Sequence, residues 1–244
     1  MKPFLLLATR AEDEAADGEY AAFLDAGGLS ADQLVRVRLE AGPMPPIDLD
    51  DYSGVIVGGS PFNASDAQAE KSDIQLRVEG ELAHLLDEIV ARDYPFLGAC
   101  YGIGLLGSHL RGVVDRHYGE PVGPSRITVT ADGAADELFA TLTPEFDAFV
   151  GHKEACSVLP PGAVLLASSE RCPVQAFRIG ANVYATQFHP ELTVDGIVTR
   201  IRVYRDYGYF SPHAMDALIE SVKAVNVTEP ARLVGAFVRR HAAP

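Results

Sequence analysis

The sequence predicts an α/β protein in which helices cover both faces of a parallel sheet. In the first half of the chain, short apolar runs alternate with amphipathic stretches in the order strand, helix, strand, strand, helix, strand, helix. That alternation favours a parallel sheet with helices on both sides. The 244 residues are 48% hydrophobic and 22% charged, which is ordinary for a folded chain with a substantial core.

The first three predicted strands lie within the first 57 residues. Phe4–Ala8 is a continuous apolar run, as expected of a parallel strand buried on both faces. A helical stretch over Glu14–Asp25 follows, and residues 34–39 indicate a second strand. The third strand, Val55–Val57, runs into Gly58-Gly59, a turn that glycine enters at low cost.

The strongest helical pattern of the first half comes next. Its apolar residues recur at i+3 and i+4 spacing and form one stripe: Ile74, Val78, Leu82, Leu85, Leu86 and Ile89. Pro95 ends this pattern, Phe96–Ala99 predicts a short strand, and 101–110 predicts a helix.

The pattern changes after residue 126. Short strand-like runs separated by Pro, Gly or Asp predict antiparallel additions to the sheet: Ile127–Thr130, Phe146–Val150, Val164–Ala167, Val174–Phe177 and Val183–Thr186. Apolar stripes at 215–222 and 233–238 predict two amphipathic helices near the end of the chain. We therefore expect one folding unit with a helical C-terminal extension.

Charge and composition argue against several classes of function. The 34 acidic and 20 basic residues give a net charge of −14, which disfavours binding to nucleic acids and anionic membranes. No stretch reaches the ~18 apolar residues of a membrane helix, and the apolar start is too short for a signal peptide. The three cysteines match neither a disulfide framework nor a zinc spacing. We expect a cytoplasmic protein without a metal or cofactor.

One cysteine has an unusual context. Gly98-Ala99-Cys100-Tyr101-Gly102 follows a predicted buried strand and precedes a predicted helix. This G-x-C-x-G pattern is typical of a nucleophile elbow, a sharp turn that places the sulfur at the carboxyl end of the sheet. The start of a helix also favours the thiolate. A buried cysteine packed between glycines is the alternative.

A candidate base lies farther along the chain. The apolar run 183–188 ends in His189-Pro190-Glu191. Residues two apart in an extended segment point to the same side, so the imidazole and the carboxylate can face one cleft. A thiol that attacks an amide needs an imidazole to take its proton and a carboxylate to orient that imidazole.

Three motifs together resemble the class I (triad) glutamine amidotransferases, especially the glutaminase domain of GMP synthetase and its stand-alone relatives. They are Gly58-Gly59-Ser60-Pro61, Gly98-Ala99-Cys100-Tyr101-Gly102 and Gln187-Phe188-His189-Pro190-Glu191. The resemblance spans roughly residues 3 to 195. It implies a flavodoxin-like, three-layer α/β/α fold with the catalytic domain in residues 1–195 and the helical extension in 196–244. It also implies hydrolysis of a glutamine side-chain amide through a γ-glutamyl thioester.

The resemblance also implies roles for individual residues. Cys100 would be the nucleophile, His189 the acid/base and Glu191 the orienting carboxylate. The backbone N–H groups of Gly59 and Tyr101 would form the oxyanion hole.

Two further positions concern the substrate pocket. His152, in Gly151-His152-Lys153-Glu154, falls where family members carry a loop beside the substrate; a surface-turn histidine is the alternative. Gly104 stands where the family has a glutamine that helps to bind the substrate, so the resemblance specifies the type of reaction more closely than the substrate.

The sequence leaves several functions open for a small-molecule substrate. The first is a glutaminase that passes ammonia to a separate synthetase partner or acts as a simple hydrolase. The second is a γ-glutamyl peptidase, and the third is a non-catalytic binding module on the same fold. The C-terminal helices could cover the site, join two subunits into a homodimer or dock a synthetase.

Overall fold

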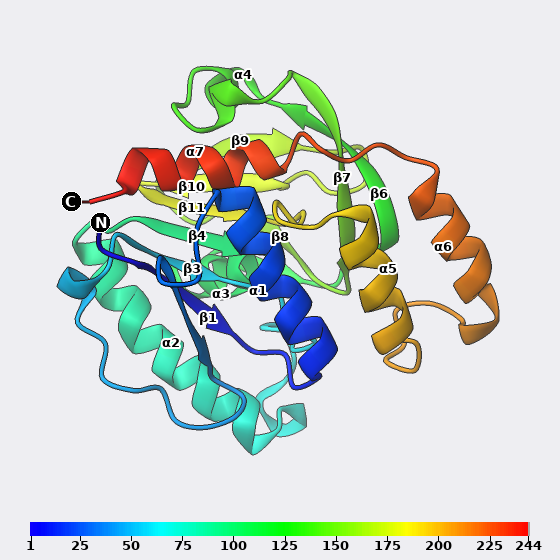
Figure 1. The fold of residues 1–244 in the computed structure, drawn as a ribbon, viewed down its shortest axis with the longest axis horizontal. Helices are drawn as coiled ribbons and strands as arrows, with labels where there is room; N and C mark the ends of the chain where they lie inside the picture. Colours follow the sequence, from blue (N-terminus) through cyan, green and yellow to red (C-terminus); the bar gives the residue numbers. More distant parts are fainter. Residues whose placement is uncertain (244) are drawn as a thin grey trace.

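The computed structural model describes residues 1–243, which fold around a nine-stranded mixed sheet (Figure 1). Its parallel half has the order β2-β1-β3-β4-β11. These strands are β1 (Phe4–Ala8), β2 (Leu34–Arg38), β3 (Gly54–Val57), β4 (Phe96–Ala99) and β11 (Val183–Thr186). The order confirms the flavodoxin-like arrangement. In it the chain places β2 on one side of β1 and then places β3 and the later parallel strands on the other side.

The other half of the sheet is antiparallel, as predicted, and continues from β11 in the order β10-β9-β6-β7. These strands are β10 (Ala176–Ile179), β9 (Val164–Ser168), β6 (Glu120–Val129) and β7 (Glu145–His152). Strand β6 begins at Glu120, seven residues before the predicted start at 127. Prolines hide the strand pattern in this part of the sequence, and a register shift between Glu120 and Gly123 accommodates them in the sheet. A separate pair, β5 (Val113–Asp115) and β8 (Ala155–Val158), was not predicted because both strands are short.

Helices cover both faces of the sheet. The helices are α1 (Asp13–Gly27), α2 (Asp73–Ala91), α3 (Tyr101–His109), α4 (Ala131–Ala134), α5 (Val194–Val203), α6 (Met215–Lys223) and α7 (Ala231–His241). Short 3₁₀ turns occur at Leu49–Asp51, Gln68–Glu70, Phe139–Thr141 and Pro212–Ala214. Figure 1 shows α1 and α7 in front of the sheet and α3 behind it. The structure thus has the predicted three layers.

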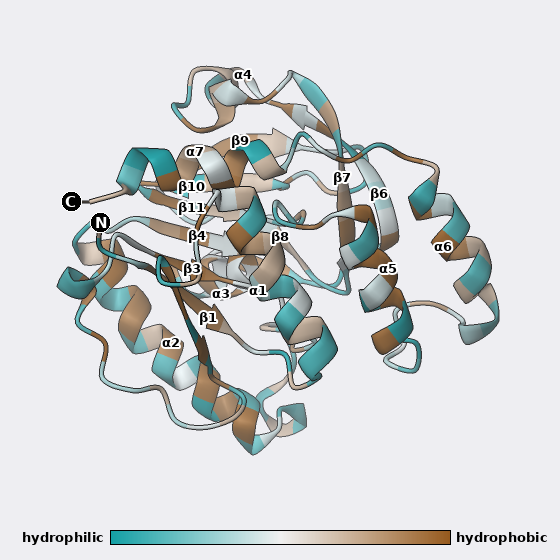
Figure 2. Ribbon diagram, viewed as in Figure 1, coloured by the Kyte–Doolittle hydropathy of each residue, from teal (hydrophilic) through white to brown (hydrophobic). Residues whose placement is uncertain are grey.

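Alternation along β1 explains why both faces are apolar. Phe4 and Leu6 join the core beneath α1 and α7, whereas Leu5 and Leu7 join the core beneath α2 and α3. Successive side chains of a strand point to opposite faces, so a wholly apolar strand serves two cores. Figure 2 shows these central strands as predominantly hydrophobic, with hydrophilic residues on the outer faces of the helices.

The C-terminal helices pack on the same body. The Phe237 ring of α7 lies 5.9 Å from the Phe4 ring, and the Lys2 amide donates to the Ala243 carbonyl at 3.0 Å. Helices α5 and α6 form a smaller cluster against Phe149 of β7. Helix α5 begins at Val194, next to the boundary expected at residue 195. Among the described residues, none of the helices combines the length and the apolar character needed to span a membrane.

We expect Phe237→Ala to destabilise the whole protein, because the ring is fully buried between α7 and β1. Removing a buried phenylalanine costs about 3–5 kcal/mol of unfolding free energy. Urea unfolding monitored by circular dichroism measures the loss. Ile74→Ala is the matched control, since that side chain is 47% exposed and its loss should matter little. An unchanged midpoint in the Phe237 variant would mean that α7 is not part of the cooperative fold.

Candidate active site

Cys100 occupies a strained turn between β4 and α3. Its backbone angles are φ 54° and ψ −90°, a region that residues with a side chain rarely adopt. The flanking glycines permit this close packing. A β-carbon at Gly98 would lie 2.9 Å from the Gly102 carbonyl carbon, and one at Gly102 would lie 3.2 Å from the Val57 oxygen. The turn therefore has the geometry predicted for a nucleophile elbow.

Pairing between β4 and β11 brings the histidine to this turn. Ala99 pairs with Thr186, and the Cys100 amide donates to the Thr186 carbonyl at 2.8 Å. Three residues farther along, the His189 amide donates to the Phe149 carbonyl at 3.0 Å. As a result, Cys100 and His189 line the same cavity.

The His189 ring is held by Glu191. Its Nδ1 lies 3.0 Å from Glu191 Oε1, and both side chains are buried. Burial lowers the pKa of His189 despite this carboxylate, so the imidazole is neutral near pH 7. Burial opposes ionisation of Glu191, but two positive charges hold its pKa well below the usual range: the His189 imidazolium, which forms in the acidic range where Glu191 titrates, and Arg200. The pair can therefore supply a neutral, oriented base.

Two buried arginines and a second buried glutamate complete this site, and the sequence analysis missed all three. Arg200 of α5 donates to Glu191 Oε1 at 2.8 Å and also contacts Glu19 Oε1 of α1 at 3.3 Å. Its Nη1 lies 2.9 Å from His189 Nδ1 and 3.5 Å from Nε2, so the guanidinium covers the imidazole. Arg10, which follows β1, pairs with Glu19 Oε1 at 3.0 Å. The only sequence signal for Arg200 was a charged residue within the otherwise apolar stripe of a helix.

Burial dominates the ionisation of Cys100. It raises the pKa of the Cys100 thiol to about 12, and the nearby Arg10 and Arg200 charges offset only part of that rise. Desolvation of a charged sulfur thus opposes the thiolate that the start of α3 is predicted to favour.

The two backbone groups expected to form an oxyanion hole differ in their surroundings. Tyr101 is the first residue of α3, where backbone N–H groups lack partners within the helix. The Gly59 amide instead donates to Glu19 Oε1 at 3.1 Å. One of the two expected donors is thus directed at a carboxylate in this structure, and the oxyanion role of Gly59 stays a prediction.

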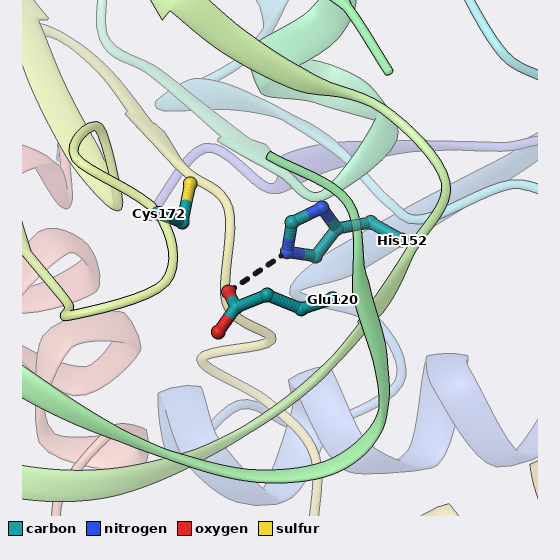
Figure 3. A group of neighbouring side chains, drawn as sticks. All are labelled: Glu120, His152 and Cys172. Atoms are coloured by element: carbon teal, nitrogen blue, oxygen red, sulfur yellow. Dashed lines mark hydrogen bonds and ion pairs between the residues drawn. The ribbon is translucent and has the colours of Figure 1, made fainter. Parts of the chain in front are cut away.

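His152 has its polar atoms engaged by the protein. Its Nδ1 lies 2.7 Å from the Glu154 carbonyl oxygen and its Nε2 lies 3.0 Å from Glu120 Oε2 (Figure 3). The ring contributes to the cavity wall near Cys100, but its nitrogens face protein acceptors. Its predicted part in the substrate pocket is therefore limited to shaping the wall.

Glu120, His152 and Cys172 bring three metal-ligating atoms within 4.8 Å of one another (Figure 3). All three side chains already have hydrogen-bond partners within the protein. In addition to the bond between Glu120 and His152, Gln175 donates to Glu120 Oε2 at 2.6 Å and the Cys172 thiol donates to the Val174 carbonyl. Burial raises the pKa of that thiol to about 12. The group accordingly forms a buried hydrogen-bonded network that supports the loop of His152.

Cavities flank Cys100 on two sides. One, of about 50 Å³, is lined by Arg10, Arg200 and apolar side chains of β6, β7 and α5. The other, of about 10 Å³, is lined by Glu154 and Gln187 among others. Tyr209, from the segment between α5 and α6, borders both cavities. The C-terminal extension therefore supplies part of the wall around the cysteine.

We expect Glu19→Ala to destabilise the fold strongly, because Glu19 is fully enclosed between Arg10 and Arg200. Removing one partner of a buried ion pair costs about 3–5 kcal/mol of unfolding free energy. Chemical denaturation measures the loss, and Glu14→Ala on the exposed face of α1 is the control. Equal stability of the two variants would contradict a structural role for this network.

Comparison with known proteins agrees with this geometry. The family described as "Glutamine amidotransferase class-I" matches residues 33–196. A GMP synthase [glutamine-hydrolyzing] of Bacillus mycoides is 34% identical over 115 residues, which cover 47% of this chain and 22% of that protein. A glutamine-hydrolysing GMP synthase subunit of Halobacterium salinarum is 28% identical over 159 residues, 65% of this chain and 76% of the relative. The chain spans about a fifth of the length of the first bacterial GMP synthases it matches.

Solved structures show the same fold. A glutamine amidotransferase of Thermotoga maritima superimposes over the full length of both chains with a TM-score of 0.79 and 22% identity. One from Methylobacillus flagellatus has a TM-score of 0.71 and 20% identity, covering 99% of this chain and 94% of the other. With the family match extending over more than half of its length, this chain belongs to the class I glutamine amidotransferases.

Proposed function

We propose that the protein hydrolyses the side-chain amide of glutamine or of a γ-glutamyl compound, with Cys100, His189 and Glu191 as a triad. The observation that carries the proposal is the placement of a strained elbow cysteine on the same cavity as a histidine oriented by a buried carboxylate. A non-catalytic module would not need this arrangement.

The reaction follows from the protonation states. Cys100 attacks the amide carbon as its proton passes to neutral His189, because burial makes a resting thiolate unfavourable. The C–N bond then breaks, and His189 returns the proton to the leaving nitrogen, which departs as ammonia. Water, activated by the same imidazole, hydrolyses the thioester and restores the thiol. Glu191 and Arg200 hold the ring in place throughout.

Stabilisation of the oxyanion depends on backbone groups at the elbow. The Tyr101 N–H at the start of α3 is one donor. For Gly59 to be the second, its amide must turn from Glu19 toward the substrate. We propose that this rotation accompanies substrate binding.

The ammonia acceptor is proposed to be a separate synthetase protein. The relative from Halobacterium salinarum is named as one subunit of a GMP synthase, which implies a partner for that protein. A glutaminase assay of the purified chain, with and without cell extract, tests this proposal. Activity that is the same without extract would argue for a simple hydrolase.

A second candidate is hydrolysis of N-substituted γ-glutamyl amides. The cavity of about 50 Å³ beside Cys100 has a partly apolar wall, which favours a substituent on the leaving nitrogen that glutamine does not carry. A substrate panel of glutamine, γ-glutamylamines and γ-glutamyl dipeptides separates the two candidates.

Substitutions in the triad should reduce turnover in a defined order. Cys100→Ala and His189→Ala should lower kcat by more than about 10⁴-fold, and Glu191→Gln by a smaller factor, since Glu191 acts through the histidine. Circular dichroism verifies the fold of each variant, and Cys172→Ala serves as the thiol control. Retained turnover in Cys100→Ala would refute the nucleophile assignment.

Arg200→Gln should move the acid limb of the kcat/KM profile to higher pH. The Arg200 charge helps to lower the pKa of His189, so its removal raises that pKa. His189 acts as a base only when neutral, above its pKa, and activity is then lost at a higher pH on acidification. Arg202→Gln, on the exposed face of α5, is the control. An unchanged acid limb would show that Arg200 does not tune the imidazole.

A further inference from the structure

Cys100 is reached through two small cavities that share part of their walls. Their volumes are about 50 Å³ and about 10 Å³, enough for about four water molecules and about one. A compound as large as an amino acid fits neither space, so a wall must move before it can reach the sulfur. The residues that border both cavities are Ser60, Cys100, Gly151 and Tyr209. Among these four, only Tyr209 has a large side chain, so its ring narrows the space beside Cys100.

Tyr209 belongs to an exposed connection between α5 and α6, the 205–211 segment. Figure 1 shows this segment as a loop at the outer end of α5. Residues 205–208 are exposed, whereas the Tyr209 side chain is half-buried. Burial raises the pKa of the Tyr209 hydroxyl well above its ordinary value, and the nearby Cys100 adds to that rise. One aromatic side chain of an otherwise exposed loop therefore lies close to the sulfur.

Hydrogen bonds from two side chains attach this segment to the rest of the protein. Lys153 Nζ donates to the Tyr207 carbonyl at 2.8 Å and lies 4.4 Å from the centre of the Tyr209 ring. On the other side, the Tyr207 hydroxyl donates to Glu12. Only Tyr209 and Phe210 among the side chains of the segment are even partly buried. Segments with little buried surface and exposed hydrogen bonds open locally at low cost in free energy, so this one can move while the sheet stays folded.

Lys153 is the attachment that acts on the Tyr209 ring itself. It lies on the loop between β7 and β8 and borders the smaller cavity beside Cys100. An ammonium group is attracted to the face of an aromatic ring, and the same group fixes the backbone two residues before that ring. A single side chain thus holds both the ring and the backbone of the segment against the wall of the site.

We propose that the 205–211 segment is a lid over Cys100, in which the Tyr209 ring restricts access and Lys153 holds the closed position. Because the ring sets the width of the space beside the sulfur, Tyr209 also determines the size of the compounds that reach it. The inference concerns access to Cys100 and does not assume that the protein hydrolyses an amide. It can therefore be tested separately from the proposed function.

The test measures how fast Cys100 reacts with N-phenylmaleimide, a bulky thiol reagent. Mass spectrometry of the digested protein gives a separate labelling rate constant for each of the 3 cysteines. Cys156 and Cys172 are fully buried, so their labelling reports loosening of the whole protein. The urea-unfolded chain gives the rate for an unprotected thiol. The measurement requires neither turnover nor a partner protein.

Tyr209→Ala and Lys153→Ala should each speed labelling of Cys100 about 10- to 100-fold, the factor expected when a cation–π contact and a charge-assisted hydrogen bond are lost. Tyr209→Phe keeps the ring and should react like the wild type. Lys223→Ala, which removes a lysine of α6 that is 49% exposed, is the matched control and should change no rate. Removing the Lys153 charge disfavours a thiolate, so faster labelling of that variant reports access to the sulfur and not its ionisation.

Three results would overturn the lid. The first is an unchanged rate for Cys100 in both Tyr209→Ala and Lys153→Ala. The second is a wild-type Cys100 that reacts as fast as the unfolded chain, because nothing then restricts access to it. The third is labelling of Cys156 and Cys172 that rises together with that of Cys100, since general loosening then explains the result.

The remaining outcomes are equally informative. Faster labelling in Tyr209→Ala alone supports the ring as the barrier and overturns the role of Lys153. The Lys153→Ala variant changes a half-buried side chain on a loop, so it keeps the test decisive if Tyr209→Ala fails to fold. Selective opening at Cys100 in a protein that hydrolyses none of the amides supports the lid and contradicts the proposed function.

Discussion

The site depends on a buried network of charges around one imidazole. Arg10 and Arg200 alternate with Glu19 and Glu191, so each charge taken out of water faces an opposite one. Such networks add little net stability but impose one geometry, because any displaced member leaves an unpaired buried charge. Here that geometry orients His189, and burial keeps its imidazole neutral by lowering its pKa. The network also links α1, β1 and α5, so the orientation of the base depends on the assembly of the fold.

Burial also controls the ionisation of Cys100, the proposed nucleophile. A thiolate at Cys100 would be stabilised by the two arginines and the start of α3, yet desolvation raises the pKa of the thiol. When Cys100 and His189 are both neutral, neither side chain holds a charge that burial would remove from water. In the proposed reaction, the substrate must then position its amide so that the proton can pass from Cys100 to His189. The Gly59 amide, held by Glu19, is consistent with a site that becomes complete only with substrate bound.

The C-terminal extension is part of the site as well as of the fold. Helix α5 contributes Arg200, the segment after it contributes Tyr209, and α7 closes one face of the sheet through Phe237. A chain ending at residue 195 would lack the cation that covers the imidazole. The extension therefore connects the cavity at Cys100 with the part of the molecular surface that α5 and α6 form.

The sequence by itself determined the layers, most strands and the positions of Cys100 and His189, because these depend on local patterns: apolar periodicity, glycine at a sharp turn, and alternation along a strand. Only the tertiary structure decided which charges meet. Arg10, Glu19 and Arg200 lie on elements far apart in sequence, and no local rule marks a buried ion pair. The same holds for Glu154, whose place beside Gly104 depends on side-chain packing between α3 and the loop after β7. Electrostatic partners are set by the distance between side chains in the folded structure. The order of residues along the chain does not give that distance directly.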